Sequence, residues 1–215
     1  QGARAGLGLP KQYQPLAGQP MLRRTAVAFL AVPGLDRIQV VIGPGQEALA
    51  AAVLAGLALP PPVTGGATRQ ESVRLGLAAL ENAAPDFVLI HDAARPLVPQ
   101  KVIGDVAAAL EGGAAGALPM LALADTLRRR EGDGWTLVPR DGLYRAQTPQ
   151  GFRFADILAA HRRFAATPAT DDVALAEMAG IAVTAVDGDE KNFKLTTQED
   201  FVMAEKMLAG EFRTA

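Results

Sequence analysis

Short strand-like runs alternate with segments of helical periodicity along most of this 215-residue chain. The strand-like runs are rich in valine, isoleucine and leucine, as in residues 37–42 and Phe87–Ile90. The segments between them place apolar residues three or four positions apart, as in Val73, Leu77 and Leu80. Such alternation is typical of βα units on a largely parallel sheet. We therefore predict an α/β fold with a mostly parallel sheet flanked by helices.

The same patterns predict the individual elements. Helices are expected at Met21–Leu30, Gln46–Leu57, from near Thr68, Val102–Leu110, Phe154–Phe164, Asp172–Met178 and from about Gln198. Strands are expected at residues 37–42, just before Gly65, at Phe87–Ile90, Ala117–Leu121 and Ile181–Val186. Thr68 and Glu71 match a capping box at one helix start, and Thr196 or Thr197 is expected to cap the last helix.

Residues 125–147 interrupt the βα alternation. Two strand-like runs, 126–130 and 135–138, flank the turn-rich tetrapeptide Glu131-Gly132-Asp133-Gly134. Glycine and aspartate at such a position favour a tight turn between antiparallel strands. We predict a hairpin arm here.

Composition excludes several classes of protein. The length fits one domain, residues 1–215, better than two. A net charge of −2 gives no general attraction for nucleic acid, and the absence of cysteine excludes disulfides, thiolate nucleophiles and cysteine metal sites. Without an apolar run of about 18–20 residues or a signal peptide, we predict a cytoplasmic protein with no membrane partner.

The chain opens with a glycine-rich segment that suits a phosphate group. Gly2 and its small neighbours allow close approach of backbone N–H groups, and Arg4 and Lys11 supply positive charge. By itself, such a loop is more often a surface turn with solvated cations. Because a phosphate loop ordinarily follows a buried strand, we expect a strand upstream of Gln1.

Three other positions combine polar chemistry with a favourable place in the fold. His91 to Pro96 follow a predicted buried strand, at the sheet edge that binds ligands in open α/β folds. Ser72 lies in the first turn of its helix, close behind Gly65 and Gly66. Lys194 precedes the last helix. Taken singly, each has a structural explanation: an Asp92–Arg95 ion pair, helix capping by Ser72 and a solvated lysine.

Taken in order, the motifs resemble one family, the 2-C-methyl-D-erythritol 4-phosphate cytidylyltransferases, over nearly the whole chain. The resemblance rests on seven motifs: Gly2 and Arg4 with Pro10-Lys11-Gln12-Tyr13; residues 65–73; His91-Asp92-Ala93-Ala94-Arg95-Pro96; Asp125-Thr126; residues 146–150; Thr170-Asp171-Asp172; and residues 192–196. The family's loop normally begins with an Ala-Ala-Gly stretch that is absent here. Some family members are fused to a cyclodiphosphate synthase.

The resemblance implies a Rossmann-like nucleotidyltransferase that transfers CMP from CTP to 2-C-methyl-D-erythritol 4-phosphate and releases pyrophosphate. It implies Arg4, Lys11 and Lys194 as catalytic cations, and Gly2, Gly66, Ala67, Ser72 and Asp92 as nucleotide-binding residues. The implied substrate-binding residues are Asp92, Arg95, Thr126, Arg140, Thr148 and Thr170. Mg²⁺ is expected mainly on the CTP phosphates, without protein ligands.

The resemblance also implies a homodimer in which the arm places Arg140 in the partner's substrate pocket. A two-stranded hairpin is marginally stable alone, and this one carries Trp135, Leu137 and Val138, which favour a covering surface. The alternative is an arm folded onto its own sheet. Two other functions remain open: a cytidylyltransferase for another polyol phosphate, such as ribitol 5-phosphate, and a non-catalytic nucleotide-binding module.

Overall fold

The computed structural model describes residues 8–211. Its α-helices are α1 (Met21–Leu30), α2 (Glu47–Leu54), α3 (Arg69–Leu80), α4 (Gln100–Glu111), α5 (Phe154–Arg163), α6 (Asp172–Met178) and α7 (Gln198–Leu208). Its strands are β1 (Pro15–Leu16), β2 (Gln19–Pro20), β3 (Val41–Ile42), β4 (Val63–Thr64), β5 (Phe87–Ile90), β6 (Gly116–Ala122), β7 (Leu127–Glu131), β8 (Gly134–Val138), β9 (Tyr144–Ala146), β10 (Gln150–Arg153) and β11 (Val183–Asp187). Short 3₁₀ turns span Lys11–Tyr13, Glu81–Ala83 and Glu190–Asn192.

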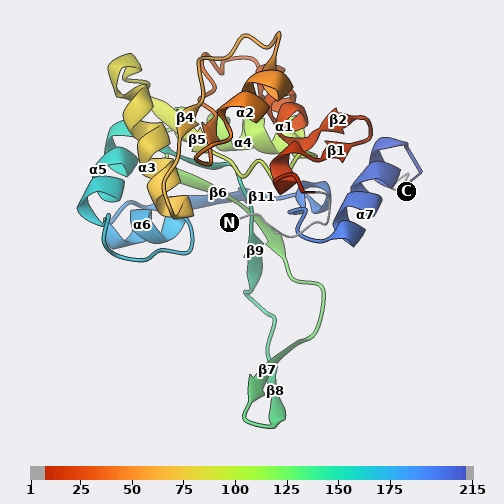
Figure 1. Ribbon diagram of the computed structural model, residues 1–215. Helices are drawn as coiled ribbons and strands as arrows, with labels where there is room; N and C mark the ends of the chain where they lie inside the picture. Colours follow the sequence, from red (N-terminus) through yellow and green to blue (C-terminus); the bar gives the residue numbers. More distant parts are fainter. Residues whose placement is uncertain (1–7, 212–215) are drawn as a thin grey trace.

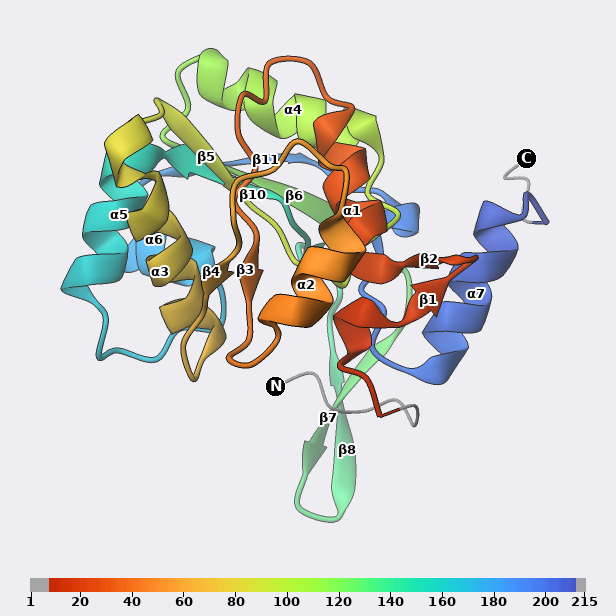
Figure 2. The same ribbon diagram turned by 45° about the horizontal axis from the view of Figure 1, so that its top comes forward.

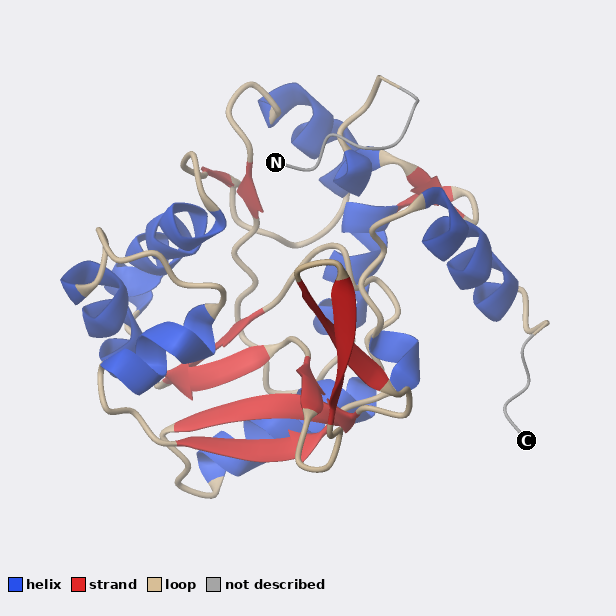
Figure 3. Cartoon of the chain, turned by 90° about the horizontal axis from the view of Figure 1, so that it is seen from below, coloured by secondary structure: helices blue, strands red, loops and turns tan. Residues whose placement is uncertain are grey.

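The main sheet has the order β11-β6-β10-β5, and β9 pairs with β6. Figure 3 shows strands of this sheet, in red, lying side by side with helices packed around them. Strands β11 and β6 are parallel, whereas β10 runs antiparallel to both β5 and β6. The predicted α/β class is therefore confirmed, with a sheet of mixed direction. Hydrophobic periodicity alone does not report strand direction, which here follows from the chain's return to the sheet after the arm.

Helices cover both faces of this sheet (Figure 1). Helix α4 packs on one face through Val106 and Leu110. Helices α3, α5 and α6 gather on the other face, where Phe152 of β10 and Ile157 of α5 are fully buried. The faces are distinct because successive residues of a strand point to opposite sides of the sheet.

A second unit of structure lies beside α3 (Figure 2). It contains α1 and α2 with the parallel pair β3-β4, and its core includes Leu22, Val40 and Ile42. The strand predicted at residues 37–42 is shorter than expected, because only Val41 and Ile42 find pairing partners, in β4. Tyr13 packs into the same core, which anchors the segment that carries Lys11.

The arm predicted at residues 125–147 is confirmed as a hairpin. Strands β7 and β8 project away from the sheet (Figure 1), and Gly132 adopts a left-handed backbone with φ of +60° at the turn. The returning strand β9 instead pairs with β6. Trp135 is 63% exposed at the arm, so the described chain provides no cover for it.

Gly151 on β10 permits the close approach of α4 to the sheet. A Cβ atom there would lie 2.6 Å from Val106 Cγ1 and 2.9 Å from Leu110 Cδ1. We expect Gly151→Ala to lower the free energy of unfolding by about 1–3 kcal/mol because of overpacking. Chemical denaturation measures this change.

Gly104 in α4 serves as the control, because a Cβ atom there would meet nothing within 4 Å. Gly104→Ala is expected to raise the free energy of unfolding by about 0.5–1 kcal/mol, since alanine loses less backbone entropy in a helix. Equal stability of the two variants would contradict the packing argument.

Candidate active site

Asp92 occupies the centre of the candidate site, two residues after β5 ends. Its Oδ2 accepts a hydrogen bond from Lys194 Nζ at 2.7 Å, and its Oδ1 accepts one from Arg69 Nε at 3.1 Å. Burial alone would raise the pKa of this carboxyl group, but the two cations outweigh burial and lower the pKa to about 2. Asp92 is therefore a permanent anion at neutral pH, with a cation on each oxygen.

Lys11 lies near Lys194. Its Nζ donates to the backbone carbonyl of Leu195, the residue that follows Lys194. Burial, and then the positive charge of Lys194, lower the pKa of Lys11. Two ammonium groups in proximity repel one another, so this arrangement favours an anionic ligand placed between them.

His91 and Thr148 fix the backbone that carries Asp92. His91 Nε2 lies 3.1 Å from the carbonyl oxygen of Arg95, which only accepts, so Nε2 carries the proton. Nδ1 is then the acceptor for the Thr148 hydroxyl at 3.0 Å, and that hydroxyl oxygen accepts from the Asp92 N–H at 3.2 Å. This chain of bonds requires neutral His91, and burial lowers the pKa of His91 to about 4.

Arg95 connects the β5 end to the segments before β10 and α7. Its Nη1 donates to the carbonyl of Asn192 at 2.6 Å, while its buried Nε has no hydrogen-bond partner in the described chain. The fully buried Asn192 in turn donates from Nδ2 to Gln147 Oε1 at 3.1 Å and to the Thr148 carbonyl at 2.8 Å. These bonds hold residues near Lys194 against the strand ends.

The glycine turn before α3 is closed by side chains of that helix. The N–H of Gly66 donates to Ser72 Oγ at 3.2 Å, and the N–H of Ala67 donates to Glu71 Oε2 at 2.9 Å. The predicted capping box is half formed: Thr68 caps the Glu71 N–H, but the Glu71 side chain reaches Ala67 rather than Thr68. A Cβ atom on Gly66 would lie 2.2 Å from the Glu71 side chain, which would have to move away from Ala67 to make room.

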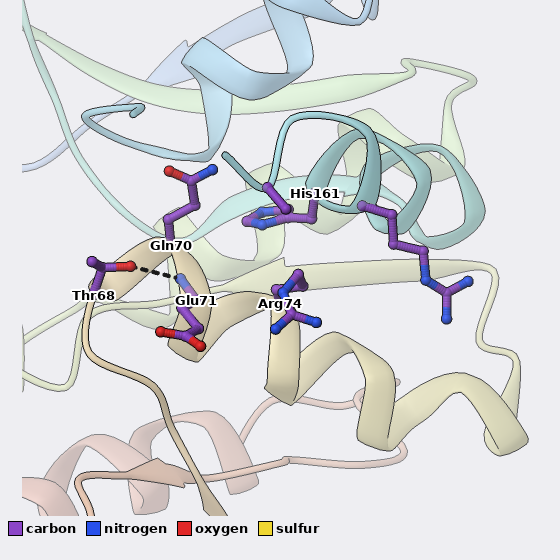
Figure 4. Close-up of a pocket in the computed structure, with 7 residues that line it drawn as sticks. Thr68, Gln70, Glu71, Arg74 and His161 are labelled. Carbon is purple, nitrogen blue, oxygen red and sulfur yellow. Dashed lines mark hydrogen bonds between the residues drawn. The ribbon is translucent and has the colours of Figure 1, made fainter. Parts of the chain in front are cut away.

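A hollow of about 430 Å³ lies between α3 and α5 (Figure 4). Its lining includes Thr68, Gln70, Glu71, Arg74 and His161. Neither Lys11, Asp92 nor Lys194 lines it. We therefore place the candidate site at the strand ends around Asp92 rather than in this hollow.

A family model described as IspD, 2-C-methyl-D-erythritol 4-phosphate cytidylyltransferase, matches residues 1–210. The chain belongs to the IspD family. The family predicted from the sequence motifs is thus confirmed.

Proteins similar to this chain include bifunctional IspD/IspF enzymes. The chain is 51% identical over 216 residues to the one from Rhizorhabdus wittichii, covering 100% of this chain and 56% of that protein. It is 53% identical over 213 residues to the one from Rhodospirillum rubrum, covering 98% of this chain and 55% of that protein. The chain therefore spans about half the length of these curated relatives.

Solved IspD-family structures have the same fold. The crystal structure of a 4-diphosphocytidyl-2C-methyl-D-erythritol synthase matches with a TM-score of 0.82 and 30% identity, covering 93% of this chain and 95% of that one. The synthase from Anaerococcus prevotii matches with a TM-score of 0.84 and 30% identity, covering 95% and 92%. The expected nucleotidyltransferase fold is confirmed.

The structure brings several predicted IspD site residues together and separates others. Lys11, Asp92, Arg95, Thr148 and Lys194 meet at the strand ends through the bonds described above. Gly66, Ala67 and Ser72 lie at the start of α3, whose first residue, Arg69, contacts Asp92.

The remaining predicted residues lie elsewhere. Thr170 is exposed just before the N-cap of α6, and exposed Thr126 and Arg140 belong to the segments at the base of the arm. Arg140 donates to the carbonyl of Ala124. Gly2 and Arg4 fall outside the described residues, as does the strand expected before Gln1.

Among residues 8–211, no three His, Asp or Glu side chains gather into a group suited to a metal ion. In the same part of the chain, no helix combines the length and apolar character needed to cross a membrane.

Sequence reasoning missed Arg69, Asp172 and Asn192, which hold the site together. All three residues lie inside the seven motifs, but the residue types of Arg69 and Asp172 alone suggest solvated helix-start charges. Asn192 gave no separate signal, because a buried amide is recognised only through its bonds.

The neutral state of His91 predicts a dependence of stability on pH. The pKa of His91 is about 4 in the folded chain against an ordinary 6.5, so the unfolded chain binds the extra proton between these values. Stability is thus fully present above pH 6.5 and is lost as the pH falls towards 4. From pH 7 to pH 5 we expect His91 to account for a loss of about 2 kcal/mol in the free energy of unfolding.

Urea denaturation of the wild type and of His91→Gln at both pH values measures this contribution. Glutamine keeps a donor for the Arg95 carbonyl but does not titrate. The free energy of unfolding of His91→Gln is therefore expected to fall less on acidification than that of the wild type, and the difference is the contribution of His91. Equal losses in both proteins would show that His91 is not the titrating group.

Proposed function

We propose that this chain transfers CMP from CTP to 2-C-methyl-D-erythritol 4-phosphate, giving 4-diphosphocytidyl-2-C-methyl-D-erythritol and pyrophosphate. The family match over residues 1–210 supports this activity. The single observation that supports this activity at the candidate site is that Lys11 and Lys194 lie near one another at the strand ends. A cytoplasmic location accords with soluble substrates.

The proposed reaction needs positioning and charge neutralisation rather than a protein nucleophile. An oxygen of the substrate phosphate attacks the α-phosphorus of CTP, a new P–O bond forms, and the bond to pyrophosphate breaks. A phosphate monoester is already largely dianionic near neutral pH, because its second pKa is about 6. In this proposal Lys11 and Lys194, with Arg4, stabilise the charge that develops around the α-phosphate.

Asp92 holds the Lys194 ammonium group in place and lies near the ribose and the polyol. Mg²⁺ would be held mainly by the CTP phosphates and would supply charge neutralisation there. We propose no protein ligand for it, since both oxygens of Asp92 are already bonded to cations.

The glycine turn is proposed to recognise cytosine. The N–H groups of Gly66 and Ala67, together with the Ser72 hydroxyl, would exchange their present partners for the base edge. Gly2 would contact the phosphates. Arg95, Thr148 and Thr170 would hold the methylerythritol phosphate, together with Thr126 and Arg140 from an arm.

The arm supports the proposal of a homodimer. Trp135, Leu137 and Tyr144 are 63%, 56% and 53% exposed, a density of large apolar side chains that favours a partner surface. Arg140 at the base of this arm is proposed to reach the substrate phosphate of the other subunit.

Pyrophosphate release tests the function directly. With CTP and methylerythritol phosphate we expect turnover, and replacement of CTP by UTP or of the substrate by ribitol 5-phosphate is expected to lower kcat/KM strongly. We further expect Lys11→Ala, Lys194→Ala and Arg4→Ala each to lower kcat by on the order of 10² or more, because donors aimed at developing charge act mainly in the transition state.

Each outcome separates one alternative. Preference for ribitol 5-phosphate would assign the chain to another cytidylyltransferase class. CTP binding without turnover by the wild type would support the non-catalytic module. Arg153→Ala is the matched control, because this exposed cation on β10 lies outside the proposed site, and it should retain wild-type turnover.

Subunit mixing tests the shared site. In a heterodimer of Arg140→Ala and Lys194→Ala chains, one site carries both lesions and the other carries neither. We expect mixing to restore activity towards that of one intact site, measured as pyrophosphate release after confirmed subunit exchange. Mixtures as inactive as the parents would place Arg140 in its own subunit's site.

A further inference from the structure

Arg69 lies between two carboxylates that belong to different parts of the fold. Its Nε donates to Asp92 Oδ1 at 3.1 Å and its Nη2 donates to Asp172 Oδ2 at 2.8 Å. These two donors form one edge of the planar guanidinium group. A side chain held at both ends of one edge has little freedom to rotate.

Asp172 is an unusual partner, because its side chain is only 1% exposed. Its second oxygen, Oδ1, lies 3.1 Å from Nε2 of His161, a fully buried residue of α5. A buried carboxylate is costly unless it is paired and hydrogen-bonded. Asp172 therefore requires both partners, and its position determines where the Arg69 guanidinium group lies.

Gln150 fixes the position of Asp172 relative to the main sheet. Its Oε1 accepts from the N–H of Asp172 at 3.1 Å and of Val173 at 3.2 Å, and its Nε2 donates to Asp171 Oδ2 at 2.9 Å. Gln150 pairs with Ile90 in the sheet, two residues before Asp92. Gln150 thus joins the strand that precedes Asp92, through backbone pairing, to the helix that carries Asp172, through its side chain.

The contacts form a continuous chain from His161 through Asp172, Arg69 and Asp92 to Lys194. Opposite charges alternate between Asp172, Arg69, Asp92 and Lys194, and every link is 3.1 Å or shorter. His161 and Asp172 lie within the protein, whereas Lys194 is 43% exposed at the site. Figure 4 shows His161 beside the first turn of α3, which carries Arg69.

We propose that His161, Asp172 and Arg69 are positioning residues that hold Asp92, and through it the Lys194 ammonium group, in the geometry for catalysis. The proposal rests on the proposed function of Lys194. It adds a set of residues beyond those proposed to contact the substrates, and it explains why a buried carboxylate is placed behind Asp92. A role limited to packing α3, α5 and α6 would not require the chain to reach Lys194.

A double-mutant cycle tests this coupling. Asp172→Asn keeps the shape of the side chain but removes its charge. We expect it to lower kcat by about tenfold or more with KM for CTP changed by less than about threefold, because misplacement of a catalytic group acts on the transition state. In the Lys194→Ala background, the same substitution is expected to lower kcat by less than about threefold, because its target is absent.

Arg162→Ala is the matched control. Arg162 follows His161 on α5 and pairs with Glu81 at 2.7 Å, so it bridges the same region without contacting Asp172 or Asp92. We expect wild-type kcat. An undiminished loss for Asp172→Asn in the Lys194→Ala background, or a wild-type kcat for Asp172→Asn alone, would overturn the proposal.

Two further arms keep the test decisive. If Asp172→Asn fails to fold, Arg69→Gln replaces it in the same cycle, since Arg69 is 35% exposed. If the wild type shows no pyrophosphate release, the proposed function fails, and carboxyl-carbon NMR titration of Asp92 then tests the network alone. A rise in the pKa of Asp92 in Arg69→Gln supports the network, whereas an unchanged value overturns it.

Discussion

The pairing of β10 with β5 is the constraint on which the rest of the site depends. The register that sets Gln150 opposite Ile90 places residues 147–150 alongside residues 90–92. From this one alignment, Thr148 reaches His91, Gln147 reaches Asn192, and Gln150 reaches the start of α6. A shift of the β10–β5 register by one residue would turn Gln150 to the other face of the sheet and break its bonds to α6.

Electrostatic balance follows from that alignment. The site contains the cations Lys11, Lys194 and Arg69. Asp92 and Asp172 are their counterions. The cations differ in the groups that hold them. Arg69 is fixed by two carboxylates, whereas the Lys11 ammonium group contacts a backbone carbonyl. Burial and the charge of Lys194 lower the pKa of Lys11, so an incoming polyanion would relieve a repulsion already present. The fold thus maintains a positive electrostatic potential where phosphates are proposed to bind.

The main sheet supports the arm as well as the candidate site. Strand β6 pairs with β10 and β11 in the body of the sheet and continues to pair with β9 at the base of the arm. The arm is therefore anchored by the strand that forms the centre of the core. This continuity gives the exposed hairpin a rigid base, which a free loop would lack.

The fold class, most helices, the hairpin and the family of this protein could be predicted from the sequence alone. Periodicity predicted the helices, the α/β class and the hairpin, because these depend on local spacing of apolar and turn residues. The motifs predicted the family, and with it Lys11, Asp92 and Lys194. Local pattern could not predict the antiparallel direction of β10, since strand direction depends on the path of the chain between strands.

Only the tertiary structure brings Arg69, His161 and Asp172 into contact. In the sequence, Asp172 is an ordinary acid at a helix start and His161 an ordinary member of an apolar helix face. Their importance comes from burial, which makes an ionised carboxylate costly unless partners from other elements reach it. Those partners are 103 residues and 11 residues away along the chain, so their contact exists only when α3, α5 and α6 are packed together on one face of the sheet.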